Sequence, residues 1–441
     1  MDAPRFISTR DLGLAIRRGA LALIALAGLI GASAASAQTA IVIGGALRMD
    51  NDAVWRRIVD EAGGPGVARF SVLATASVAP ERSAQTIIDE LVRHGAQAEH
   101  IPVAPRLEGA DLQKNLADPE LLAKVRASNA VFFSGGAQGF IVDTLLPQGQ
   151  ATPMLDAIWE VYRRGGVVAG TSAGAAIMSR VMFRDALDVM GVMRGQMRDG
   201  QEVDRGLGFI GDDLFVDQHF LKRGRIGRML PLMLAKGYRL GLGVEENSAA
   251  VIRDQRVDII GARGALLVDL RDARSDPALG VLNVRGARLS YLDSGDRHDL
   301  RSGVTEPAAR KTAANPAVPV RASAQGQPMP TRGPVDTFQP DILGDNRIVQ
   351  AMAELLSSPA AEVRAMAARV RPGATGERDR TGFVFRLYRG SDTQGWIDDG
   401  GDARDVTLLD VRLDVRPVRL PDPTAAAPSA MPGIVIPAAM R

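Results

Sequence analysis

Short apolar runs alternate with amphipathic stretches from about residue 40 to residue 257, and this alternation restricts the fold more than any other feature of the sequence. One helical pattern covers 53–62, and another begins at Pro80 and stops at Gly95. Strands that alternate with helices favour a parallel sheet covered on both faces. We therefore predict a three-layer α/β fold, in which ligands bind beyond the carboxyl ends of the strands. The clearest predicted strands are 40–43, 70–74, 130–133 and 167–169.

A change of composition divides the rest of the chain. Residues 301–340 are rich in Ala, Pro, Gly, Ser and Arg, which is typical of a linker. It would separate a main domain, 38–300, from a C-terminal accessory region, 341–441. In that region we expect a small α+β unit, with helices over 347–357 and 360–370 and strands over 383–388 and 406–415.

The first 37 residues have the pattern of a signal peptide. A basic start is followed by an apolar run, 20–32, that is too short to span a bilayer comfortably. Ala35-Ser36-Ala37 is a small-residue cleavage site, so the mature chain would begin at Gln38. We expect an exported protein, periplasmic or extracellular, without stable membrane insertion after cleavage. An uncleaved membrane anchor is the alternative.

Composition excludes several kinds of chemistry. The chain has no cysteine, which rules out disulfides, a thiol nucleophile and a thiolate metal site. No cluster of side chains has metal-ligand spacing, so we expect neither a metal nor a cofactor. The formal net charge of +2 gives no general attraction to nucleic acid. A histidine base has four candidates, His94, His100, His219 and His298.

The strongest motif is Gly170-Thr171-Ser172-Ala173-Gly174, which follows the predicted strand 167–169 and precedes a helix-like run. A G-x-S-x-G sequence between a strand and a helix is typical of a nucleophile elbow. The helix N-terminus behind the serine favours the negative charge that develops during acyl transfer. Ser172 is therefore our candidate nucleophile, and a glycine-rich turn without chemistry is the alternative.

Two other strand ends carry groups suited to the same chemistry. Paired glycines after the strand 130–133 allow a backbone N–H to point at a ligand, so we predict an oxyanion hole from Gly136 and Ala173, with a tight turn as the alternative. The apolar run 214–216 leads to His219, which is the predicted base because it alone of the four histidines sits at a strand end in the main domain.

A carboxylate usually orients such a histidine. Glu245 and Glu246 follow an apolar run, and adjacent strand residues point to opposite faces, so at most one of them reaches His219. The spacing from His219 to Glu246 suits a strand that returns to the same edge. The full set of candidates is Asp185, Asp188, Asp217, Glu245 and Glu246.

Together these motifs resemble the cyanophycinase-like serine peptidases, relatives of peptidase E. The similarity covers about residues 40–255, with a nucleophile motif at 170–179, a histidine block at 217–228 and an acidic motif at 243–249. It implies a fold like the class I glutamine amidotransferases, here with the small C-terminal α+β extension. It also implies that Glu246 is the third member of the triad, and this is our choice.

The resemblance further implies a substrate. Cyanophycin is a poly-aspartate chain with arginine on each β-carboxyl, and the family releases β-aspartyl-arginine dipeptides. Gln138, Asp217 and Gln218 match positions that the family uses around the substrate. The expected partner is thus a peptide or polymer rich in Asp and Arg, while a homodimer is left open. Guanidinium groups suited to substrate carboxylates lie just after His219, on Arg223, Arg225 and Arg228, with a solvated helix start as the alternative.

Two other functions remain open at this point. An α/β-hydrolase esterase would share the elbow at Ser172 but would need a histidine far downstream, for which His298 is the only candidate. A non-catalytic polymer-binding protein on the same scaffold is the second alternative.

Overall fold

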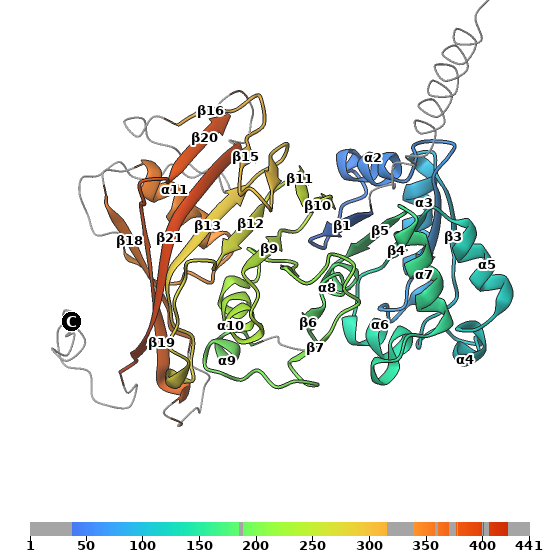
Figure 1. Cartoon of the computed structure of the whole chain (residues 1–441), viewed down its shortest axis with the longest axis horizontal. Helices are drawn as coiled ribbons and strands as arrows, with labels where there is room; N and C mark the ends of the chain where they lie inside the picture. The colour runs from blue at the N-terminus through green and yellow to red at the C-terminus, as the bar shows by residue number, and fades with distance from the viewer. Residues whose placement is uncertain are drawn as a thin grey trace, which may run out of the picture.

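The computed structural model describes residues 38–184, 188–314, 338–357, 360–369, 376, 378–398, 400 and 405–421. The predicted signal peptide, residues 315–337 of the predicted linker, Asp185 and the last twenty residues lie outside this part of the chain. Two large sheets, which we name the first and second sheet, organise the molecule; Figure 1 shows the first on the right and the second on the left. A short pair, β6 (Val181–Phe183) and β7 (Val203–Arg205), lies apart from both.

The first sheet has nine strands, and five neighbouring strands among them are parallel. Four antiparallel strands extend the sheet at one edge. The α/β prediction is confirmed, although the sheet is mixed rather than wholly parallel. The order is β15 (Thr305–Glu306), β14 (Arg297–Asp299), β11 (Arg256–Gly261), β10 (Ser248–Arg253), β1 (Thr39–Ile43), β5 (Val167–Thr171), β4 (Ala130–Phe133), β2 (Arg69–Leu73) and β3 (Gln97–His100).

Helices cover both faces of the first sheet. Strand β1 shows why: Ile41 and Ile43 pack into one core, and Ala40 and Val42 into the other, as alternation along a strand requires. The first core contains α2 (Asp52–Glu61) and α3 (Pro80–Arg93). The second contains α5 (Pro119–Ala127), α6 (Gln138–Leu145), α7 (Pro153–Arg163) and α8 (Ala173–Ala176).

The second sheet has ten strands and is mostly antiparallel. The hydrophobic core of this sheet, the third core of the molecule, also contains residues of α9 (Val189–Met193), α10 (Ile226–Lys236) and α11 (Arg347–Ser357). Eight strands follow the order β17 (Phe338–Gln339), β18 (Glu362–Ala367), β19 (Thr381–Tyr388), β21 (Asp405–Arg419), β13 (Val284–Leu292), β12 (Ala265–Asp269), β9 (Leu240–Val244) and β8 (Leu214–Asp217). The other two are β16 (Thr312–Ala313), which pairs with β20 (Gln394–Asp398).

The C-terminal region does not form a separate extension, because β21 pairs directly with β13 of the main domain. The predicted linker also begins too early: Lys311 is fully buried in an ion pair with Asp296, at 2.8 Å. Composition suggested a solvated segment there, but long-range contacts with β21 bury it. The helix predicted over 347–357 is confirmed as α11.

The helix predicted over 360–370 is wrong. This segment contains strand β18, in which Val363, Ala365 and Ala367 are buried at a period of two. Its alanines favour a helix locally, but pairing with β19 and packing on α11 override that preference. Among the described residues no helix is both long and apolar enough to cross a membrane.

Candidate active site

Ser172 lies in a tight turn between β5 and α8. Its backbone has φ 54° and ψ −107°, a region that few non-glycine residues adopt. The turn is held because Ser172 N–H donates to the Ile43 carbonyl at 3.1 Å. The helix must also approach closely, since a Cβ on Gly174 would lie 2.4 Å from the Phe133 carbonyl oxygen. This is the geometry of a strand–elbow–helix motif at the carboxyl end of the parallel strands.

The histidine block places His219 directly on this serine. Strand β8 ends at Asp217, and His219 Nε2 lies 2.8 Å from Ser172 Oγ. The His219 N–H donates to the Gly44 carbonyl at 2.7 Å, which ties the end of the second sheet to β1 of the first.

Gly45, in the turn after β1, is a residue of the site that the sequence analysis did not identify. Gly45 has φ 101°, and a Cβ there would lie 2.3 Å from His219 Cε1. Gly45 therefore makes room for the imidazole. The paired glycines that follow the predicted strand 40–43 were the available signal.

The two adjacent glutamates point in different directions. Glu246 lies between β9 and β10, and its Oε1 is 2.6 Å from His219 Nδ1. Glu245 is fully buried, and its Oε2 accepts the N–H groups of Leu221 and Lys222 at 2.5 and 3.0 Å. Burial raises the pKa of Glu245. One glutamate thus contacts the imidazole, whereas the other holds the backbone that follows it.

The electrostatic surroundings of His219 favour its neutral form. Burial lowers the pKa of His219, Glu246 raises it, and the charges of Arg223 and Arg225 lower it further. The net direction is downward. A neutral imidazole accepts a hydrogen bond at one nitrogen and donates one from the other. The contacts to Ser172 and Glu246 allow this arrangement.

Two backbone N–H groups beside the serine are available for an anion. Ala173 begins α8, and Gly136 follows β4. Within the described part of the chain neither N–H donates to another protein group. The neighbouring Gly135 lies against the serine, since a Cβ there would be 3.3 Å from Ser172 Cβ. The arrangement is compatible with the predicted oxyanion hole.

Four of the predicted substrate contacts are buried and pair with one another. Arg228 Nε and Nη2 donate to Asp217 at 2.7 and 2.6 Å, and Arg225 Nη1 donates to Asp217 and to Gln218 Oε1 at 3.2 and 2.6 Å. All four side chains belong to residues that are at most 5% exposed. These contacts and the burial favour a structural role for the four side chains, and their binding of substrate stays a prediction. They form an ion network beneath the histidine.

The two other predicted contacts remain accessible. Arg223 is exposed on the turn after His219. Gln138 is the first residue of α6, and its amide donates to the Phe183 carbonyl at 2.6 Å.

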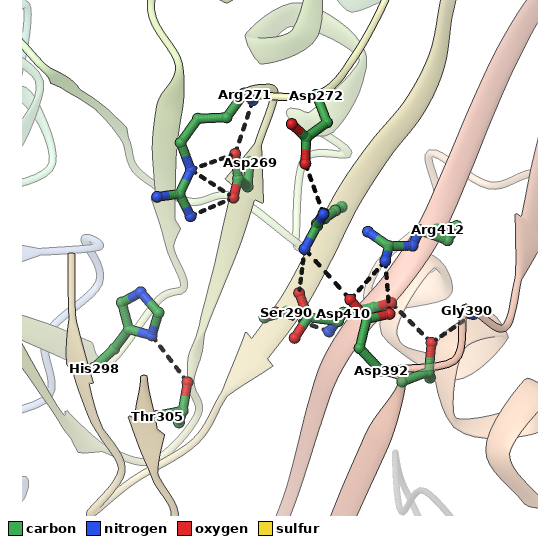
Figure 2. Close-up of polar contacts among 12 residues, drawn as sticks. Asp269, Arg271, Asp272, Ser290, His298, Thr305, Gly390, Asp392, Asp410 and Arg412 are labelled. Carbon is green, nitrogen blue, oxygen red and sulfur yellow. Dashed lines mark hydrogen bonds and ion pairs between the residues drawn. The ribbon is translucent and has the colours of Figure 1, made fainter. Parts of the chain in front are cut away.

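The remaining histidines do not join this site. His298 lies on β14, and its Nδ1 is 2.9 Å from Thr305 Oγ1 (Figure 2). Strand β14 is four strand spacings from β5, so His298 is about 19 Å from the strand that carries the elbow. Burial lowers the pKa of His298 to about 4. The esterase alternative, which needed His298, is not supported.

No metal site accompanies the triad in the part of the chain that the structure describes, where no group of three or more His, Asp or Glu could hold an ion.

Comparison with known proteins identifies the family. The sequence model of Peptidase family S51 matches residues 41–260. A cyanophycinase of Trichormus variabilis is 33% identical over 201 residues, which are 44% of this chain and 64% of that protein. A cyanophycinase of Geminocystis herdmanii is 28% identical over 281 residues, which are 59% of this chain and 93% of that protein. The match thus spans somewhat less than two thirds of the length of the first relative.

Two solved structures are also similar. One is a peptidase from an acI-B1 Actinobacterium, with a TM-score of 0.41, 21% identity, and coverage of 52% of this chain and 91% of that chain. The other is a putative peptidase E protein from Listeria monocytogenes, with a TM-score of 0.36, 16% identity, and coverage of 51% and 99%. On the family match to residues 41–260 and its cyanophycinase relatives, the chain belongs to peptidase family S51, the cyanophycinase-like serine-type peptidases.

Proposed function

We propose that this protein is a serine peptidase that hydrolyses β-aspartyl peptide bonds, such as those of cyanophycin, through Ser172, His219 and Glu246. The observation that carries the proposal is the unbroken chain of contacts from Ser172 Oγ to His219 Nε2, at 2.8 Å, and from His219 Nδ1 to Glu246 Oε1, at 2.6 Å. Such a chain converts a weakly nucleophilic hydroxyl into one that can form an acyl-enzyme.

The mechanism follows from the position of each group. Ser172 Oγ attacks the scissile carbonyl carbon while its proton passes to His219 Nε2. The N–H groups of Gly136 and Ala173 stabilise the oxyanion, and Glu246 stabilises the imidazolium. His219 then gives its proton to the leaving amine, and the acyl-enzyme forms as the C–N bond breaks. Water, deprotonated by His219, hydrolyses the ester and restores Ser172.

The substrate part of the proposal rests on two accessible groups. Arg223 offers a charged guanidinium beside the triad, suited to a substrate carboxylate. Gln138 can still accept a hydrogen bond through its side-chain oxygen, because the amide nitrogen makes the contact to Phe183. A peptide that carries carboxylates and guanidinium groups, such as cyanophycin, would contact both Arg223 and Gln138.

Location and fold family belong to the same proposal. The basic, apolar and small-residue pattern of residues 1–37 supports export, to the periplasm or outside the cell. The parallel strands from β1 to β3, with helices on both faces, support an arrangement like that of the class I glutamine amidotransferases.

The test uses the full mature chain and a panel of substrates. Wild-type protein and Ser172→Ala are incubated with insoluble cyanophycin, β-aspartyl-arginine polymers of defined length, and matched α-aspartyl peptides. We expect release of β-aspartyl dipeptides by the wild type, loss of activity below the detection limit in the variant, and retention of polymer binding, since the hydroxyl contributes little packing. A serine-directed phosphonate should label Ser172 alone.

Polymer binding without hydrolysis or labelling would establish the non-catalytic alternative. Activity on α-aspartyl peptides alone would keep the peptidase and exclude the β-aspartyl substrate. A Ser172→Ala variant that retains one tenth of the wild-type rate would exclude the nucleophile.

A further inference from the structure

A segment of the C-terminal region packs directly on residues 220–225, the turn between His219 and α10. We name this segment, Asp341–Asn346, the clamp segment. A Cβ on Gly224 would lie 2.2 Å from the Leu343 carbonyl oxygen, and one on Gly227 would lie 3.2 Å from Leu343 Cδ2. The turn and the clamp segment therefore touch at the backbone, without room for a side chain between them.

Polar contacts add to this packing. Asn346 N–H donates to the Leu221 carbonyl at 3.3 Å, and Lys222 Nζ lies 2.7 Å from Asp345 Oδ2. Asp345 Oδ1 also lies 3.4 Å from Arg263 Nη1, in the connection between β11 and β12. Three features of the turn, the carbonyl of Leu221, the side chain of Lys222 and the Cα of Gly224, thus contact one short segment.

The clamp segment is itself anchored in the second sheet. Ile342 N–H donates to the Met366 carbonyl of β18 at 3.0 Å. Ile342 and Leu343 are 1% and 4% exposed, in the core that also contains α11 and β19. Motion of the clamp segment would therefore require disruption of that core.

The turn needs support from outside because its own conformation is strained. His219 has φ 47°, so its backbone is held by neighbours rather than by local preference. The peptide groups of Leu221 are fixed from two directions: its N–H by the buried Glu245 and its carbonyl by Asn346. The Leu221 carbonyl also accepts the Gly224 N–H at 3.3 Å, a contact within the turn, so Asn346 supplies the hold on this carbonyl from the C-terminal region.

We propose that Leu343 and Asp345 are positioning residues for His219, so that the C-terminal region completes the active site instead of serving as a separable accessory. The kinetic part of this proposal rests on the proposed peptidase function, whereas its structural part does not. The clamp segment acts by holding the turn, and neither residue touches the reacting atoms.

The decisive experiment compares Leu343→Ala with Leu387→Ala in the full mature chain. Leu387 lies on β19, is fully buried, and belongs to the same core as Leu343. We expect both variants to melt at lower temperature. At a temperature where both are folded, Leu343→Ala should lower kcat roughly tenfold with little change in KM, because a small displacement of a catalytic group is costly. Leu387→Ala should keep kcat within twofold.

A second readout does not depend on activity. The four histidines can be titrated by NMR, with the His219 signal identified from a His219→Gln variant. Burial is the main reason that the pKa of His219 is low. A loosened turn should therefore raise the His219 pKa toward its ordinary value in Leu343→Ala and leave it unchanged in Leu387→Ala.

If Leu343→Ala does not fold, the half-exposed Asp345 decides. Asp345→Asn should lower kcat two- to fivefold, Asp345→Glu should restore it, and Asp272→Asn, a control on the surface of the second sheet, should have no effect. Equal kcat and equal His219 titration in the clamp and control variants would overturn the proposal. A wild type that cleaves nothing, but whose His219 pKa responds to Leu343→Ala, would overturn the proposed function alone.

Discussion

The molecule contains two ion networks built from the same residue types, one beneath His219 and one on the second sheet. Beneath His219, Asp217 pairs with Arg225 and Arg228, and the three side chains are 3–6% exposed. On the second sheet, Figure 2 shows a larger set of charged side chains, at the end of β12 and across the neighbouring β13 and β21. We name it the charged face; it consists of Asp269, Arg271, Asp272, Arg288, Asp392 and Arg412.

The two networks differ in the solvent exposure of their side chains. Side chains of the charged face are 13–68% exposed, so water and salt screen their interactions. Its acids and bases can reform pairs with neighbours: Arg288 lies within 4 Å of Asp272, Asp392 and Asp410. The buried network lacks solvent as a substitute partner. Removal of Asp217 there would leave two buried guanidinium groups without their carboxylate, which is costly.

The difference teaches that arginines near the triad cannot be assigned to one role by their spacing. Arg223 is exposed and can meet a ligand, while Arg225 and Arg228 support the strand end that carries His219. Four substitutions test this contrast.

The largest difference in kcat is expected between substitutions of two carboxylates, Glu246 beside His219 and Asp269 on the charged face. Glu246→Gln should lower kcat by about 10³–10⁴-fold, because the histidine loses the partner that fixes its tautomer and stabilises its charged form. Steady-state kinetics on a β-aspartyl peptide measure this. Asp269→Asn on the charged face is the control and should stay within twofold of the wild type. Full activity of Glu246→Gln together with an inactive Asp188→Asn would move the triad to a different acid.

The buried arginine should matter for stability. Arg228→Met should lower the free energy of unfolding by about 3–5 kcal/mol, since Asp217 loses its strongest partner in a buried setting. Chemical denaturation measures this value. A loss below about 1 kcal/mol, with a large loss of substrate affinity, would favour the predicted substrate-binding role of Arg228 over the structural one.

The exposed arginine should act through pH. A base must be neutral, so kcat/KM is present above the His219 pKa and is lost as the pH falls through it. The charge of Arg223 lowers that pKa. Arg223→Gln should therefore raise the pKa and shift the acidic limb of the pH profile to higher pH, less so at high salt. Arg271→Gln on the charged face should leave the limb in place, and an equal shift in both variants would contradict a local effect.

The charged face should show the smallest effect. Arg412→Ala should lower the free energy of unfolding by about 0.2–1 kcal/mol, because Arg412 pairs with a partly exposed Asp392. The loss should shrink as salt is added. A loss as large as that of Arg228→Met would show that exposure does not separate the two networks.

Much of the site could be predicted because its motifs are local. The elbow requires a strand, small residues and a helix within about ten positions, and all are visible between Val167 and Met178. The alternation of side chains along an extended segment correctly indicated that only one of Glu245 and Glu246 reaches His219. The catalytic roles of these residues stay predictions until activity is measured.

Long-range contacts decided the rest. The α/β alternation, the elbow at Ser172 and the helix at 347–357 could be read from the chain alone, because each depends on the pattern of neighbouring residues. Three features depend instead on tertiary contacts: the strand at 362–367, the burial of Arg225 and Arg228, and the position of Leu343 on the turn after His219. These depend on what packs against each segment, and the partners come from positions far along the chain, which no local pattern encodes.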